Sequence, residues 1–184
     1  EVAKQFLNKD QYPLAEEYFE RSINAYLESS TSNAAIIGAE TIERGRELYQ
    51  KSLYQEANNL INLGISTLAK AGQKLQAAQT SRIEGEKFLQ STEPQMGLDF
   101  LQKSIQIYND LKELNPIAEI YATIGDYYIT KDQLNDGLTN FIESCKLYIN
   151  LNNQKDLNKI LNKMVAFGID IAEGKLPAEE LDNK

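Results

Sequence analysis

The clearest stretch of the chain runs from Ile120 to Tyr148 and reads IYATIGDYYITKDQLNDGLTNFIESCKLY. It holds two apolar patterns separated by the polar turn Lys131-Asp132-Gln133. Its two glycines belong to columns that repeat with a step of 40 residues along the chain. The members of these columns are Gly45, Gly85 and Gly125, and then Gly97 and Gly137. A fixed step of this length is typical of repeat proteins, so we expect several stacked copies of one unit.

Other positions keep their residue size at the same step. The apolar columns are Ile61, Leu101 and Phe141, then Ile65, Ile105 and Cys145, then Leu68, Tyr108 and Tyr148, and a small column holds Gly64, Ser104 and Ser144. The start of the chain joins with a step of 42, because Lys9-Asp10-Gln11 matches the later turn at residues 131–133. Its column members are Ala3, Phe6, Ala15, Phe19, Ser22, Ile23 and Tyr26. We therefore predict four copies, the first with a shortened leading helix.

The columns have helical spacing. Ala15, Phe19, Ser22, Ile23 and Tyr26 follow the i, i+4, i+7, i+8, i+11 pattern, which marks one face of a helix and not a strand. A glycine inside a helix costs about 1 kcal/mol relative to alanine. Its recurrence predicts that a neighbouring helix approaches there too closely for a side chain. The same columns place Cys145 in the core, away from any reactive environment, and make the tyrosines of the last column packing residues.

Residues that break helices divide the chain into nine predicted helices and a polar tail. The helices cover residues 1–8, 13–29, 33–51, 53–70, 73–91, 93–113, 116–131, 133–150 and 154–173, and the tail covers 174–184. Ser52 with Gln55, and Thr92 with Gln95, have the spacing of a capping box, and Pro94 falls in a first turn. We expect one domain of residues 1–173, with repeats at 1–32, 33–72, 73–115 and 116–153 and a capping helix at 154–173.

Helical hairpins that cannot bury their apolar face alone stack on one another, so the expected fold is an all-α solenoid. The copy with Ile124-Gly125, Tyr128, Gly137, Phe141 and Ser144 resembles the tetratricopeptide repeat. This resemblance implies a right-handed superhelical stack of antiparallel hairpins and binding of protein partners. The chain departs from that family in its step of 40 residues, where the family has 34. Longer hairpins resemble the soluble NSF attachment protein branch, which implies an adaptor in vesicle-mediated membrane trafficking that holds helical, SNARE-like partners.

The amino-acid composition excludes several classes of function. The net charge of −8 opposes nonspecific attraction to nucleic acid or to an anionic membrane. The chain has no His and a single Cys, which removes the usual general base and the Cys/His zinc sites. We therefore expect a protein without catalytic activity, cofactor or metal, and an enzyme that uses only carboxylates, Tyr or Lys remains an alternative. No apolar run approaches the length of a membrane span, and a cytoplasmic location is expected.

Two candidate partner-binding surfaces follow from the helical register. In such stacks the leading helices of the hairpins usually line the concave side, and their polar positions form the first surface: Arg46, Tyr49, Gln50, Arg82, Glu86, Gln90, Asp126 and Thr130. The second is a basic stripe of Lys155, Lys159 and Lys163 on the last helix, for which simple solubility is the competing interpretation. We expect an adaptor that binds a peptide or helix in the groove. A structural subunit of a larger complex is the alternative.

Overall fold

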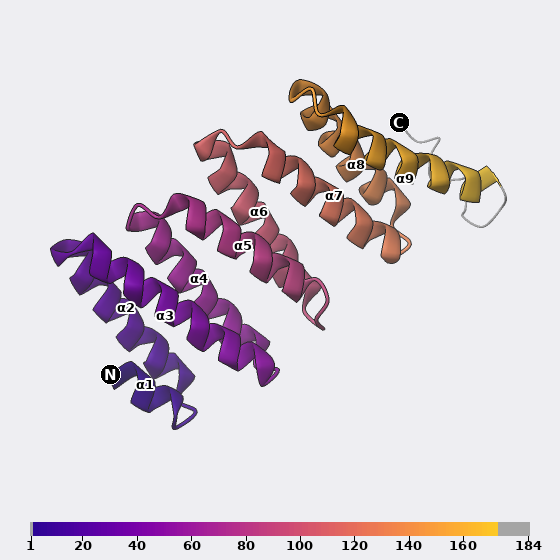
Figure 1. The fold of residues 1–184 in the computed structure, drawn as a ribbon. Helices are drawn as coiled ribbons and strands as arrows, with labels where there is room; N and C mark the ends of the chain where they lie inside the picture. The colour runs from indigo at the N-terminus through magenta and orange to yellow at the C-terminus, as the bar shows by residue number, and fades with distance from the viewer. Residues whose placement is uncertain (1, 173–184) are drawn as a thin grey trace. The chain divides into compact units, whose positions relative to one another are not determined.

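The computed structural model describes residues 2–172, without the side chains of residues 169–172, and this part of the chain is entirely helical (Figure 1). Its helices are α1 Val2–Leu7, α2 Tyr12–Ser29, α3 Thr31–Gln50, α4 Tyr54–Lys70, α5 Lys74–Phe88, α6 Pro94–Leu111, α7 Leu114–Thr130, α8 Leu134–Asn150 and α9 Gln154–Ala172. The all-α prediction is confirmed, and each predicted helix is present with ends that agree within three residues. The predicted tail, residues 174–184, lies outside the described residues.

The chain forms two compact units, Glu1–Ile107 and Tyr108–Lys184, and the division falls near the end of α6. Within the first unit the hairpins are α1 with α2, α3 with α4, and α5 with α6, and consecutive helices pack against each other. Within the second unit α7 and α8 form a hairpin and α9 packs on α8. The stacking of neighbouring helices that the repeat predicts is therefore present within each unit.

The close helix crossings predicted from the glycines are confirmed. A Cβ atom on Gly85 of α5 would lie 2.7 Å from Leu101 Cγ and 3.0 Å from the Gly97 carbonyl oxygen of α6. In the second unit, a Cβ atom on Gly125 of α7 would lie 2.6 Å from Phe141 Cδ1 of α8. Real Cβ atoms essentially never come within 3.0 Å of another heavy atom. Glycine is thus required where the two helices of a hairpin meet.

The column of small residues adds hydrogen bonds across the same hairpins. Ser104 Oγ of α6 donates to the carbonyl oxygen of Ala78 in α5 at 2.8 Å, and Ser144 Oγ of α8 donates to that of Ala118 in α7 at 2.8 Å. Both serines are fully buried. In the α3–α4 hairpin the equivalent residue is Gly64, where a Cβ atom would lie 2.5 Å from the Gly38 carbonyl oxygen. In the two hairpins that carry serine, the hydroxyl thus gives a buried backbone carbonyl oxygen a hydrogen bond in addition to the one within its own helix.

The turns differ from the sequence prediction at Ser52. Ser52 has a positive φ of 61°, and the N–H of Leu53 donates to the Leu48 carbonyl oxygen at 3.0 Å. This is the left-handed end of α3, a Schellman turn. The N-cap of α4 is Leu53, which makes no side-chain cap hydrogen bond, so the predicted capping box of Ser52 and Gln55 is wrong. Ser52 lies between the end of α3 and the start of α4, and it belongs to the turn that ends α3. The spacing of Ser52 and Gln55 alone does not show which of the two helix ends Ser52 serves.

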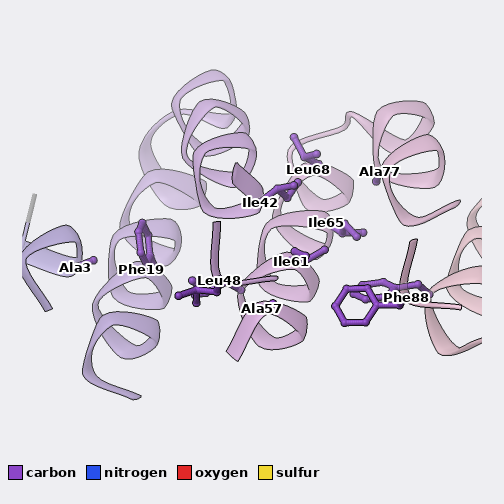
Figure 2. Close-up of a cluster of buried hydrophobic side chains, with 12 residues drawn as sticks. Ala3, Phe19, Ile42, Leu48, Ala57, Ile61, Ile65, Leu68, Ala77 and Phe88 are labelled. Carbon is purple, nitrogen blue, oxygen red and sulfur yellow. The ribbon is translucent and has the colours of Figure 1, made fainter. Parts of the chain in front are cut away.

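Each unit has its own apolar core. In the first unit, side chains from all three hairpins meet in one cluster that includes Phe19, Ile61 and Phe88 (Figure 2). In the second unit, Cys145 and Tyr148 of α8 pack with Leu157 and Ile160 of α9. The predicted core position of Cys145 is confirmed, since it is 8% exposed.

Tyr26 is the exception to the packing column. Tyr108 and Tyr148 are buried, but Tyr26 is 38% exposed, so its predicted core role is wrong. The cause is the short leading helix of the first hairpin, because α1 has six residues and α2 has 18. Antiparallel pairing from the turn near Asp10 lets α1 cover only the beginning of α2, and Tyr26 near its end is left uncovered.

Candidate partner-binding face

Two hollows flank the C-terminal half of α3 in the first unit. The first, of about 530 Å³, lies between α1 and α3, and the second, of about 280 Å³, lies between α3 and α5. Glu47 of α3 lines both. We call the surface formed by these two hollows the leading-helix face. Its lining residues are Lys4, Gln5, Leu7, Asn8, Asp10, Glu43, Arg44, Arg46, Glu47, Leu48, Tyr49, Gln50, Lys51, Glu84 and Lys87.

Arg46, a predicted groove residue, ties α3 to α5. Its Nε donates to Glu84 Oε1 at 2.8 Å and its guanidinium also pairs with Glu43. Lys87 Nζ lies 3.2 Å from the same Glu84 oxygen. The Glu84 side chain is only 2% exposed, and a buried carboxylate needs such partners. Arg46 is therefore held by the stack and supplies little free charge to a ligand.

Tyr49 forms the aromatic wall of the same hollow. Its ring meets Phe88 edge-on with ring centroids 4.8 Å apart and Tyr54 at 5.2 Å. Its hydroxyl donates to the Lys87 carbonyl oxygen at 3.1 Å. Burial raises the pKa of Tyr49, so the phenol stays a neutral donor. Gln50 beside it is exposed, and its side-chain amide makes no hydrogen bond within the described residues.

The predicted groove residues of α5 lie outside both hollows. Arg82 Nε donates to Glu86 Oε1 at 2.8 Å, an i,i+4 pair along one helix. Gln90 is exposed just after the end of α5. The structure thus brings Arg46, Tyr49 and Gln50 together in one hollow and does not add Arg82, Glu86 or Gln90 to it.

In the second unit, the two predicted surfaces meet at one ion pair. Lys163 Nζ of α9 donates to both carboxylate oxygens of Asp126 in α7, at 2.8 and 2.6 Å. Lys159 pairs with Asp156 on its own helix at 2.6 Å, and Lys155 is exposed. Thr130 is exposed and its hydroxyl donates to the Tyr127 carbonyl oxygen. The basic stripe is thus largely neutralised, and Lys163 and Asp126 connect two leading helices as Arg46 and Glu84 do.

Sequence reasoning missed several residues of the leading-helix face, among them Asn8, Glu84 and Lys87. Glu84 gave one usable signal, a charged residue between the buried positions Ser81 and Phe88. Asn8 gave another, because it precedes Gln50 by the 42-residue step of the first copy. Lys4 adds a third ion pair between neighbouring leading helices, 2.5 Å from Glu40 of α3.

The charged residues of this face are mostly paired with each other. Cations and carboxylates are largely paired with each other within one helix or between adjacent helices, as in Arg44 with Glu47 at 2.8 Å. Among the described residues there is no group of three or more His, Cys, Asp or Glu placed to hold a metal ion. None of the described helices combines the length and the apolar character that a membrane span requires.

Comparison with known proteins adds no relative. A scan against protein-family models finds no model that matches this chain, and a search of the curated proteins finds no match.

Proposed function

We propose that this protein is a non-catalytic binding module that takes a segment of a partner protein on its leading-helix face. The observation that carries the proposal is the pair of hollows on either side of α3, about 530 and 280 Å³ in size. Stacked helical hairpins commonly present such surfaces to partners, and concave sites are the usual places of binding. The mixed charges and the half-buried Tyr49 supply polar and aromatic contacts of the kind found in interfaces.

The proposal is tested by site-specific photo-crosslinking in the native host. A benzophenone amino acid at Gln50 lies at the edge of the hollow between α3 and α5. The matched control places it at Gln106, an exposed amide of α6 that lines neither hollow. We expect a discrete cross-linked protein with the probe at Gln50 and none with the probe at Gln106. Equal labelling at both positions, or none at Gln50, contradicts the proposal.

A second candidate is a structural subunit, favoured by an open apolar stripe on α9. Leu161 and Val165 are 42% and 61% exposed. Val165 follows Gly125 by the 40-residue step, and Gly125 faces Phe141 of the second helix of its hairpin. The face of α9 that carries Val165 is therefore the one that, by analogy with α7, would contact a further helix. In native extracts, this candidate predicts a large assembly for the wild type and a monomer for Val165→Asp, and monomeric elution of both contradicts it.

A further inference from the structure

Lys103 is a half-buried lysine of α6 that is bound by neutral groups only. Its Nζ donates to Asn62 Oδ1 at 2.9 Å and to Ser66 Oγ at 3.0 Å, both in α4. Asp99, one turn earlier in α6, is exposed and accepts a hydrogen bond from Gln95 instead. Within the described residues, the ammonium group of Lys103 is therefore a partly buried charge without a counter-charge.

This environment favours the neutral amine. A charge that is taken out of water without a partner loses its hydration, and burial lowers the pKa of Lys103 from its ordinary value of 10.5. Lys163, by contrast, lies 2.6 Å from an Asp126 carboxylate oxygen, which favours the ammonium form. Only the neutral amine has the lone pair that attacks an electrophile. Lys103 therefore offers more of the nucleophilic form near neutral pH than a lysine with the ordinary pKa.

A hollow beside the two acceptors gives a small reagent room. It has a volume of about 310 Å³ and lies between α2 and α4. Asn62 and Ser66, the residues that hold the Lys103 amine, both line it, together with Glu16 and Glu20 of α2. A water molecule takes about 30 Å³, so the hollow is large enough for a short acyl group. It shares no lining residue with the leading-helix face.

The hydrogen bonds of the Lys103 amine distinguish between its possible modifications. An amide removes the charge, keeps one N–H for Asn62 and adds a carbonyl oxygen to which the Ser66 hydroxyl can donate. A neutral imine, formed with an aldehyde, keeps no N–H and leaves the Asn62 oxygen without its donor. A carbamate, formed with carbon dioxide, adds a negative charge beside a hollow that already holds Glu16 and Glu20. The site therefore suits an acyl group.

We infer that Lys103 is a site of N-acylation by an acyl thioester. The neutral amine attacks the carbonyl carbon of the thioester, a C–N bond forms and the C–S bond breaks. The amine proton leaves with the sulfur as a thiol. The product is a neutral amide, so acylation removes the buried charge that has no partner. The inference goes beyond the proposed function, because Lys103 lines neither hollow of the leading-helix face.

The test measures the acetylation rate of each lysine in the full, folded chain. The probe is S-acetyl-N-acetylcysteamine, a small uncharged thioester, used at about pH 8, where a lysine with the ordinary pKa is almost fully protonated. Peptide mass spectrometry compares Lys103 with Lys112, an exposed lysine directly after α6. We expect Lys103 to react at least about threefold faster, because more of it is neutral. An acetylation rate at Lys103 that is no higher than at Lys112 overturns the inference.

Two matched substitutions test the role of the neutral acceptors. Asn62→Asp places a carboxylate at the oxygen that lies 2.9 Å from Lys103 Nζ, so acetylation of Lys103 should fall at least about tenfold. Asn58→Asp adds the same charge one turn earlier in α4 and keeps an acceptor for Asn62 Nδ2, so the rate should change less than about twofold. Lys112 should react alike in all three proteins. An unchanged Lys103 rate in Asn62→Asp, or an equal fall in both variants, overturns the inference.

Discussion

Glu84 is the only buried charged residue in the described part of the chain. Its carboxylate is held between Arg46 of the preceding hairpin and Lys87 of its own helix. A buried ion pair contributes little net stability, but removal of one partner leaves the other uncompensated. Glu84 thus connects the second and third hairpins. The sequence pattern alone places Glu84 on a helix but does not predict this contact.

We expect Glu84→Gln to lower the free energy of unfolding by about 2–3 kcal/mol, because Arg46 loses its buried counter-charge. The measurement is urea denaturation followed by circular dichroism. Glu86→Gln is the control, since Glu86 forms a more exposed pair with Arg82 and should cost less than about 1 kcal/mol. Equal effects of the two substitutions would show that Arg46 does not depend on Glu84.

Gly85 and Gly168 make a matched pair of helical glycines. Gly85→Ala should destabilise the fold by about 1–3 kcal/mol, because its Cβ would meet Leu101 and the Gly97 carbonyl of the facing helix. Gly168 has no atom within 4 Å of a Cβ position, so Gly168→Ala should stabilise by about 1 kcal/mol through helix propensity. Thermal unfolding measures both. A stabilising Gly85→Ala would contradict the close crossing.

Cys145 gives a prediction about pH. Burial raises the pKa of this thiol from its ordinary value of 9.0, so the folded state holds the proton more tightly than the unfolded state. The unfolded state releases it first, and stability should fall as the pH rises through 9.0 towards the folded pKa. Cys145→Ser should remove this part of the alkaline decline in urea titrations. An identical decline in both proteins would show that the thiol does not contribute.

Most of the turns between the described helices share one geometry, and the α2–α3 and α5–α6 turns do not. Residues with positive φ occur at Asp10, Ser52, Lys112, Asp132 and Asn152, and at Gly72. The N–H of the following residue returns to a carbonyl five residues earlier, as Gln133 does to Tyr128 at 3.0 Å. Side chains at such positions cost about 1–2 kcal/mol, and only one of these turns uses glycine.

We therefore expect Ser52→Gly to raise the free energy of unfolding by about 0.5–1 kcal/mol, since it relieves the left-handed conformation at the end of α3. Ser91→Gly is the contrasting change. Ser91 has no positive φ, and its hydroxyl donates to the Phe88 carbonyl and accepts from the Glu93 N–H, so its loss should destabilise. Chemical denaturation compares the two, and a destabilising Ser52→Gly would argue against the Schellman turn.

The whole chain divides into the units Glu1–Ile107 and Tyr108–Lys184, each with its own apolar cluster. In stacked hairpins each unit contacts mainly its neighbours, and stability is approximately local. A substitution in one core should therefore loosen that unit more than the other.

Hydrogen exchange can test this locality. Gly125→Ala places a Cβ atom 2.6 Å from Phe141 Cδ1 and should strain the α7–α8 hairpin. We expect faster amide exchange in α7, α8 and α9 and little change in α2, α3 and α4. A uniform increase along the chain would instead indicate one cooperative unit.

Periodicity was sufficient to predict the nine described helices and the close crossings at Gly85 and Gly125, because both depend on local spacing and on side-chain size. It also selected Arg46, Tyr49 and Gln50, which the structure brings into one hollow. The pairing of Arg46 with Glu84 and of Asp126 with Lys163 needed the packed helices, since the partners are 38 and 37 residues apart. The exposure of Tyr26 likewise depended on how far α1 covers α2. Spacing reports which side of a helix is apolar, whereas contacts between helices depend on distances that arise only when the hairpins have stacked.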